Sequence, residues 1–215
     1  WTDPAVAGRA IDPPLLLTYS ATGTPSPAKG ACSPNWTPGC RIILHYPDHI
    51  QPLWDKNRGN DTCILCHATR DANGILQVPA GQLDLSGSAS PDQADHLTSY
   101  RELLFPDNVQ ILNMGALQDQ LVQATDANGQ PLFQTDNNGN LILDNSGNPI
   151  PVMITVPVAP VMSTNGAASS PRFFSLFQTG GTHQGRLSPD ELRLISEWLD
   201  IGAQYYNNPF SAPAL

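Results

Sequence analysis

Apolar side chains recur at three- and four-residue spacing in three segments of the chain, and this spacing predicts helices with one buried face. The clearest segment is the last. It follows Ser188, and its first turn contains a proline and two acidic residues, which are favoured at a helix N-terminus. Shorter helices are predicted around residues 48–54, with Pro52 in the first turn, and 98–104, with Thr98 as N-cap. The apolar positions of the final helix are Leu192, Ile195, Trp198, Leu199 and Gly202.

The segment from 125 to 160 has a different pattern. Three turns rich in Asp, Asn and Gly begin at Asp126, Asp136 and Asp144, and they separate short runs of β-branched and aliphatic residues. Turns of this composition between such runs predict β-hairpins. Their oxygen-rich side chains also suit calcium, although no glutamate closes a twelve-residue loop as a bidentate ligand. We therefore expect a β-hairpin insertion, with a calcium site as the alternative.

The first 40 residues are rich in proline, glycine, threonine and serine and show no sustained period. This composition predicts an extended segment wrapped on the surface. Cys32 and Cys40 lie in a turn-rich stretch of this segment and are predicted to form a disulfide, with two unlinked thiols as the alternative. Because disulfides persist in oxidising compartments, we expect the protein in the periplasm or outside the cell.

The pentapeptide from Cys63 to His67 carries the most specific chemistry in the chain. Two cysteines three positions apart and a histidine directly after the second form the pattern that attaches haem c covalently. The thiols of Cys63 and Cys66 are predicted to form thioethers with the haem vinyl groups. His67 is then held beneath the iron as its proximal ligand. The sequence therefore predicts one covalently attached haem.

Two other interpretations of these cysteines are open. A structural zinc site needs four ligands, and Cys32 and Cys40 do not stand at ligand-like spacing from the first pair. A thioredoxin-type dithiol needs a strand before it and a long helix after it, whereas residues 56–61 have the composition of a loop. Both patterns fit less well than haem attachment.

The second axial ligand of an electron-transfer haem has several candidates. His183 is the first choice, because it lies in a glycine-flanked loop, 180–185, that leads directly into the final helix. Met162 is the second choice, since buried methionines more often fill gaps in a core than bind metal. The candidates ranked below these two are Met114, Met153, His45, His49 and His96.

Composition excludes one class of function. The net charge is −9, the pI is near 4.7, and the ten Lys and Arg residues are scattered. Binding to a phosphate backbone needs a basic cluster, so nucleic acid is not an expected partner. No apolar run approaches the length of a membrane span. Only 13% of residues are charged, and the 17 glycines and 21 prolines predict much loop and turn.

Several stretches resemble exported bacterial cytochrome c domains. They are 45–54, the haem motif, 81–85 with 100–104, and 187–192 with 197–203. In many members of that group, a Met-Pro pair in the loop before the last helix supplies the iron ligand. This chain has Thr182, His183 and Gln184 in that loop, and the difference favours ligation by two histidines.

A narrower resemblance covers residues 41–207. This part of the chain is similar to the cytochrome modules of secreted multidomain redox proteins in bacteria that degrade plant cell walls. The resemblance implies electron delivery to a copper-dependent polysaccharide monooxygenase. It also implies that the chain could be a module of a larger secreted protein.

Together these features predict a mainly α fold, in which a cytochrome c-like helical haem core is enlarged by long loops. We expect a single monohaem domain over 1–215. It would consist of an N-terminal wrap (1–40), a haem-attachment half (41–124), a β-hairpin insertion (125–160) and a distal loop with the C-terminal helix (161–215).

The expected function is electron transfer outside the cytoplasm, through transient contact with a redox partner and without enzymatic activity. One alternative is a peroxidase-like enzyme with an open sixth position on the iron. A second alternative is a carbohydrate-binding module, because Trp1, Trp36 and Trp54 occur in turn-rich segments.

Overall fold

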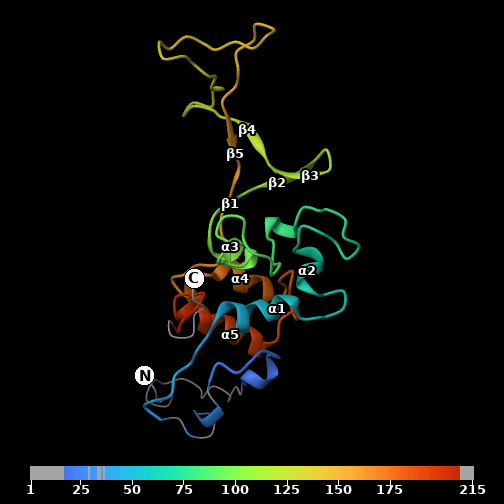
Figure 1. Cartoon of the computed structure of the whole chain (residues 1–215), viewed down its shortest axis with the longest axis vertical. Helices are drawn as coiled ribbons and strands as arrows, with labels where there is room; N and C mark the ends of the chain where they lie inside the picture. The colour runs from blue at the N-terminus through green and yellow to red at the C-terminus, as the bar shows by residue number, and fades with distance from the viewer. Residues whose placement is uncertain (1–16, 29, 33–34, 36, 209–215) are drawn as a thin grey trace.

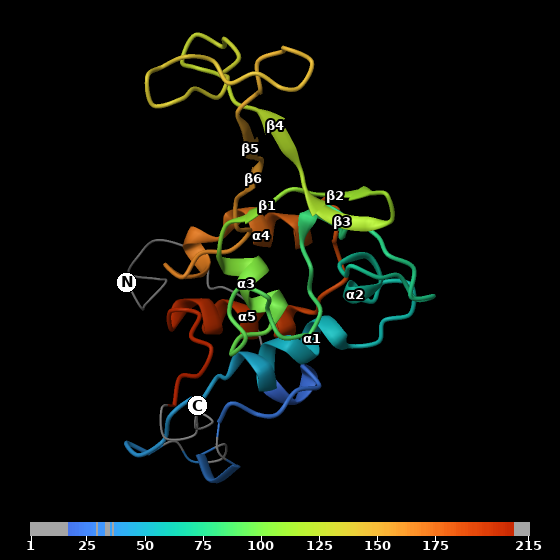
Figure 2. The same ribbon diagram turned by 45° about the horizontal axis from the view of Figure 1, so that its top comes forward.

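The computed structural model describes residues 17–28, 30–32, 35 and 37–208. These residues form a body of short helices from which a narrow arm extends, as Figure 1 shows. We call residues 107–158 the β-arm. The second view brings the outer end of the β-arm forward and separates its loops (Figure 2).

The longest helix of the body is α5 (Pro189–Asp200). Its predicted start is confirmed, because the Glu191 amide donates to Ser188 Oγ (3.2 Å) and the Glu191 carboxylate accepts from the Ser188 amide (2.9 Å). The predicted helix at 98–104 is confirmed as α3 (Thr98–Leu104), although its N-cap is Leu97 and no side chain caps it. The other helices are α1 (Gln51–Asp55), α2 (Cys63–Cys66) and α4 (Pro171–Phe174), the π-helical turn η3 (Tyr46–Ile50), and the 3₁₀ turns η1 (Tyr19–Ala21), η2 (Gly30–Cys32), η4 (Ala80–Gln82), η5 (Ala167–Ser169) and η6 (Ser175–Phe177).

The hydrophobic core lies where η3, α1, α3 and α5 meet. Leu53 and Leu194 are completely buried in it. Tyr46 is also completely buried, and its hydroxyl donates to Ser99 Oγ (2.8 Å) and accepts from Trp54 Nε1 (3.0 Å). The buried Tyr46 hydroxyl therefore both donates and accepts a hydrogen bond within the core. The core fixes the segment that precedes the haem motif against the final helix.

The β-arm consists of three two-stranded antiparallel sheets. They are β1 (Asp107–Asn108) with β6 (Pro157–Val158) at the base, the hairpin of β2 (Gln110–Asn113) and β3 (Ala116–Asp119), and β4 (Leu121–Gln123) with β5 (Met153–Thr155) farther out. Beyond the last pair, residues 124–152 form turns and isolated bridges. The β-arm is thus a branched ribbon rather than one continuous sheet.

Each branch point of the β-arm is a closed ring of three backbone hydrogen bonds. In the first ring the Val109 amide donates to the Val156 carbonyl (2.8 Å), Gln120 donates to Val109 (2.7 Å), and Val156 donates to Gln120 (3.2 Å). The second ring joins Ala124, Leu132 and Val152, and the third joins Gln134, Ile142 and Ile150. Each ring pairs backbone groups of three segments with one another. Three segments can therefore meet at one point without forming a three-stranded sheet.

The outer loops of the β-arm repeat one turn. In the first, Asp126 Oδ1 accepts from the amides of Asn128 and Gln130, both at 2.8 Å, and Gly129 has a φ of 79°. Asp136 and Asp144 make the same pair of bonds in their own loops. Aspartate at the first position and glycine at a position with positive φ explain why these sequences turn. The predicted turns are therefore present.

The predicted fold class, mainly α with a cytochrome c-like helical core, is wrong. The structure is 29% helical and 17% strand. The α-helices are short because prolines and glycines interrupt the chain, and strand pairing already begins at Asp107. The first hairpin turns at Met114 and Gly115, with φ of 48° and 81°. A two-residue turn with two positive φ values usually contains Asn-Gly. Met114-Gly115 is therefore a weak sequence signal for such a turn.

The predicted disulfide between Cys32 and Cys40 is confirmed. Of the predicted N-terminal wrap, residues 1–16, 29, 33, 34 and 36 lie outside the described residues. The Tyr19 hydroxyl donates to the Glu197 carboxylate of α5 (2.8 Å), so this segment lies against the final helix. None of the helices in the described ranges has the length and apolar character needed to cross a bilayer.

Candidate functional site

A cavity of about 460 Å³ lies between α2, the turn η4, the base of the β-arm, α4 and the loop before α5. Its size is that of a pocket for a cofactor or another small molecule. Aromatic and aliphatic side chains form much of its wall, among them Trp54, Leu103, Phe173 and Phe177. Such a wall favours a flat apolar ligand over water.

Both cysteines of the haem motif line this cavity. They stand at the first and last positions of the single helical turn α2, and residues three apart on a helix lie on the same face. Neither takes part in a disulfide. Burial raises the pKa of the Cys63 thiol, so the group is held as the neutral thiol. Two thiols on one side of a turn can both reach one edge of a porphyrin.

His67 ends the turn and lines the same cavity. Its amide donates to the Cys63 carbonyl (2.9 Å), and its own carbonyl accepts from the Leu85 amide (2.8 Å). The ring nitrogen Nδ1 is buried without an aligned hydrogen-bond partner, although the backbones of Ala80 and Leu83 lie beside the ring. Desolvation, and secondly the nearby His183, lowers the pKa of His67. A neutral imidazole is the form that binds iron.

His183 approaches His67 from the loop before α5. The two ring centres are 5.9 Å apart, with their planes at 39°. The His183 amide donates to the Leu176 carbonyl (2.8 Å), which ties its loop to η6. Thr182 Oγ1 lies 2.9 Å from His183 Nδ1, so a hydrogen bond orients the imidazole and leaves Nε2 available. Burial lowers the pKa of His183 as well.

The loop that carries His183 depends on one glycine. A Cβ at Gly181 would stand 2.3 Å from the Leu176 carbonyl oxygen, which belongs to rigid backbone. Glycine therefore permits the close approach that the bond from His183 to Leu176 requires.

The spacing of the two histidines fits a six-coordinate haem iron. A metal bound to two opposite imidazole nitrogens, at about 2 Å from each, holds the ring centres about 6 Å apart. The observed 5.9 Å matches this value. The two thiols and the two imidazoles that line this cavity are the ligand types that a covalently attached haem requires.

The other predicted ligands do not reach this cavity. Met162, the second choice, is 3% exposed and packs in the hydrophobic core. Met114 is 99% exposed at the turn of the β2–β3 hairpin, and Met153 lies on β5. His45 and His49 are buried on η3, where His45 Nδ1 lies 3.2 Å from the Asp48 carboxylate. His96 stacks on Tyr205, with ring centres 4.6 Å apart.

The alternative interpretations of the cysteines find less support. Within the described part of the chain, no group of three or more His, Cys, Asp or Glu side chains stands close enough together to hold a metal ion. A zinc site needs such a group. The turn α2 ends at Cys66, so the long helix of a thioredoxin-type dithiol is not present there. In the β-arm, one carboxylate oxygen each of Asp126, Asp136 and Asp144 accepts hydrogen bonds from backbone amides of its own loop. These oxygens do not point toward a shared calcium site.

Sequence reasoning did not identify four charged residues of the cavity wall, Asp61, Glu102, Arg172 and Arg186. Arg172 follows the proline that starts α4, and its Nη1 donates to the Ala159 carbonyl (3.2 Å). Arg186 follows His183 closely and pairs with Asp61 (3.2 Å). The Ser-Pro-Arg-Phe-Phe run at 170–174 has the cap and N1 proline of a helix start, and this signal could have pointed to Arg172.

A buried ion-pair network joins the haem motif to the final helix. Glu191 of α5 is 2% exposed, and its carboxylate accepts from Lys56 Nζ (2.7 Å) and Arg58 Nη2 (2.9 Å). Arg58 also donates to the Leu53 carbonyl at the end of α1 (2.6 Å). The network therefore holds the loop before Cys63 against the start of α5, directly after the His183 loop.

Comparisons with protein-family models, with curated proteins and with solved structures find no match to this chain. The resemblance to exported cytochrome c domains therefore stays a prediction. The function has to be argued from the side chains that the fold brings to the cavity.

Proposed function

We propose that this chain is a monohaem c-type cytochrome that transfers electrons. Cys63 and Cys66 would hold the haem covalently, and His67 and His183 would bind the iron from its two sides. The observation that carries the proposal is the convergence of these four side chains on one cavity, with the imidazole centres 5.9 Å apart. Haem iron, when bound, supplies a one-electron couple between the ferrous and ferric states.

The residues around the cavity have separate tasks in this proposal. The two thiols would anchor the cofactor, and His67 and His183 would both bind its iron. Phe173 and Phe177 exclude water from the cavity. Thr182 Oγ1 would accept a hydrogen bond from the Nδ1–H group of His183, which leaves Nε2 free to bind the iron. The wall is held rigid by the core and by the network around Glu191.

The two guanidinium groups of the wall suit the haem carboxylates. Arg172 and Arg186 are the two basic residues among those that line the cavity. Guanidinium binds carboxylate with parallel hydrogen bonds, so these side chains are the ones that would pair with the propionates. This pairing would offset the cost of placing the propionates in a mainly apolar cavity.

The geometry favours a carrier over a peroxidase. Two imidazoles at this separation leave room for an iron between them but none for a peroxide. The carbohydrate-binding alternative has little support in the described residues, since Trp54 is 2% exposed in the core. Trp1 and Trp36 lie outside the described residues.

The partner implied by the resemblance is a secreted copper-dependent polysaccharide monooxygenase. Electron transfer needs only brief contact at the haem edge, for which a small interface is sufficient. The disulfide between Cys32 and Cys40 is compatible with the periplasmic or extracellular location that such a partner requires. Reduction of the ferric protein and its reoxidation by the monooxygenase, followed by stopped-flow absorbance, tests this pairing.

Attachment of the haem is tested by intact mass and absorption after expression in a host that attaches haem c in its periplasm. We expect the added mass of one haem, its loss when Cys63 and Cys66 are both replaced by serine, and no carbon monoxide adduct of the reduced protein. His183→Ala should convert the low-spin iron to high spin, whereas the matched control His96→Ala should leave it low spin. A mass equal to that of the polypeptide alone would refute the proposal.

A further inference from the structure

The β-arm exposes an unusual amount of apolar surface. Of the sixteen large apolar side chains that are exposed among the described residues, twelve belong to it. Met114 is 99% exposed, and Leu121 on β4 and Ile154 on β5 are about half exposed. Exposed apolar side chains in such number mark contact sites on soluble proteins. On the β4–β5 pair they lie on both faces, with Leu121 and Met153 on one and Val122 and Ile154 on the other. The other members are Ile111, Leu112, Val122, Leu132, Phe133, Leu141, Ile142, Leu143 and Met153.

The strands that carry these side chains also have unpaired edges. Every sheet of the β-arm has two strands, so each strand has one edge with no partner strand among the described residues. Proteins usually protect such edges with lysine, proline or an inward-pointing charge. The strands β2, β3, β4 and β5 contain none of these except Asp119. These edges can accept a further extended strand.

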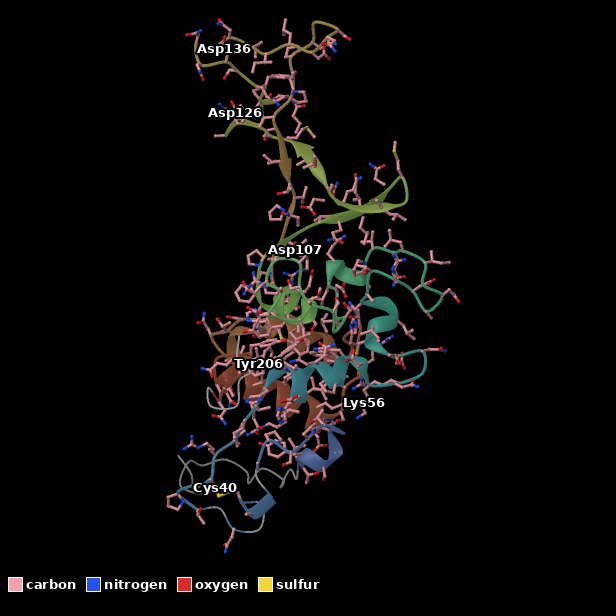
Figure 3. All side chains as sticks on the ribbon, viewed as in Figure 1. Cys40, Lys56, Asp107, Asp126, Asp136 and Tyr206 are labelled. Atoms are coloured by element: carbon pink, nitrogen blue, oxygen red, sulfur yellow. A yellow bond between two sulfur atoms is a disulfide. The ribbon has the colours of Figure 1, made fainter. Side chains whose placement is uncertain are left out.

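The charge of the β-arm has a single sign. Between Arg101 and Arg172 the sequence has no lysine, arginine or histidine, and the five charged residues of the β-arm are aspartates. Figure 3 shows Asp107 at the base of the arm and Asp126 and Asp136 toward its outer end. Hydrogen bonds from the backbone hold the pKa of Asp126 and Asp144 below the ordinary value, and for Asp136 the Asn140 side chain contributes most. The outer carboxylates therefore stay ionised.

From this combination we propose that the β-arm binds an extended segment of a partner protein, in which basic side chains alternate with apolar ones. The segment would add a strand to an open edge, with its apolar residues on the aliphatic surface and its basic residues toward the aspartates. Val158 of β6 lines the haem cavity, so a partner held at the base of the β-arm would be beside the proposed haem site.

A second copy of this chain is a poor occupant. Each copy has a net charge of −9, and two β-arms would place carboxylates against carboxylates. The basic residues Lys56, Arg58, Arg186 and Arg193 of the body already pair with carboxylates of the same chain. The net negative charge of each copy therefore favours a different protein as the source of the basic side chains.

The probe for this surface is a synthetic peptide of alternating lysine and valine, about twelve residues long so that it spans the open edges. Binding to the full-length chain is measured by biolayer interferometry at low and at moderate salt. We expect binding that weakens about fivefold or more as salt rises. A lysine–serine peptide should bind at least about tenfold more weakly, because it lacks the apolar face.

Variants of the chain locate the binding. The triple variant Asp126→Asn, Asp136→Asn, Asp144→Asn removes charge but keeps a side-chain carbonyl that can accept the same turn hydrogen bonds. It should weaken binding about fivefold. The matched control is Asp71→Asn, because Asp71 makes the same turn in the body, where Oδ1 accepts from Asn73 and Ile75. Val122→Thr with Ile154→Thr, which changes a cross-strand pair on one face of the β4–β5 sheet, should also weaken binding.

Several outcomes would overturn the proposal. One is equal binding by the triple variant, the threonine double variant and the Asp71 control. Another is a lysine–serine peptide that binds as tightly as the lysine–valine peptide, since charge alone would then explain the contact. A third is a dimer in analytical ultracentrifugation that the threonine double variant abolishes, since this would make a second copy the occupant. The readout is peptide binding, so failure of the haem assignment would not affect it.

Discussion

The ring centres of His67 and His183 lie 5.9 Å apart, although one residue ends the turn α2 and the other precedes α5. Neither local segment determines this distance. It results from the core that holds η3 and α1 against α5, and from the network in which Glu191 binds Lys56 and Arg58. If iron binds between the rings, changes to these supports should be visible in its spectrum.

Replacing Thr182 by valine should alter the iron ligand without removing it. The variant loses the oxygen that lies 2.9 Å from His183 Nδ1, so the imidazole donates less electron density to ferric iron. We expect a shifted low-spin electron paramagnetic resonance signal and a higher midpoint potential. Thr182→Ser keeps the hydroxyl and should behave as the parent. Identical spectra for the valine and parent proteins would show that this hydrogen bond has no role.

Gly181→Ala should displace the loop that holds His183. The added Cβ would lie 2.3 Å from the Leu176 carbonyl oxygen, so the backbone has to move. We expect a loss of about 1–3 kcal/mol in the free energy of unfolding and a fraction of high-spin haem. Gly30→Ala is the control, since nothing lies within 4 Å of its Cβ position. Urea unfolding with absorption spectroscopy measures both effects, and a low-spin variant of parental stability would contradict the prediction.

Glu191→Gln should destabilise the body. The carboxylate is 2% exposed and compensates two cations, so its neutralisation leaves Arg58 buried without its counterion. We expect a loss of about 3 kcal/mol or more in the free energy of unfolding. Lys56→Met should cost less than about 1 kcal/mol, because the Lys56 side chain is 40% exposed and Arg58 still pairs with Glu191. Equal losses in the two variants would contradict this division.

Glu102 should make the protein less stable as the pH rises. Burial, and then the nearby Asp107, raises the pKa of Glu102 from 4.5 to about 8. Because the folded-state pKa is the higher one, the unfolded state loses its proton first, and the free energy of unfolding falls between these two pH values. The slope is at most about 1.4 kcal/mol per pH unit.

The measurement for Glu102 is best made from pH 6.5 to 8. Burial lowers the pKa of His49 and His96 below the ordinary histidine value of 6.5. These two residues therefore make the free energy of unfolding rise with pH only below pH 6.5. Above that value the decline from Glu102 should dominate. Glu102→Gln should flatten the curve, and Asp107→Asn should make it shallower. An unchanged slope in Glu102→Gln would rule out this residue as its source.

Local signals in the sequence predicted several features that the structure confirms. The helix start at Ser188, the disulfide and the turns at Asp126, Asp136 and Asp144 all depend on residues a few positions apart. The β-arm was recognised only from residue 125 onward, because the hairpin turn at Met114 and Gly115 lacks the usual composition. The bounds of the predicted helices agree closely with the structure, since 98–104 is α3 and the final helix ends at Asp200, two residues before the last apolar position of the predicted stripe.

The sequence by itself pointed to Cys63, Cys66 and His67 as the side chains that we propose to carry the chemistry, because the motif from Cys63 to His67 is contiguous. Only the tertiary structure decided which distant side chain approaches that motif. It placed His183 beside His67 and buried Met162 in the core, and it brought Arg172 and Glu102 to the same cavity. The physical reason is that contacts between remote residues depend on how helices and loops pack. The packing energy comes from many residues across the whole body, so no single position in the sequence determines such a contact.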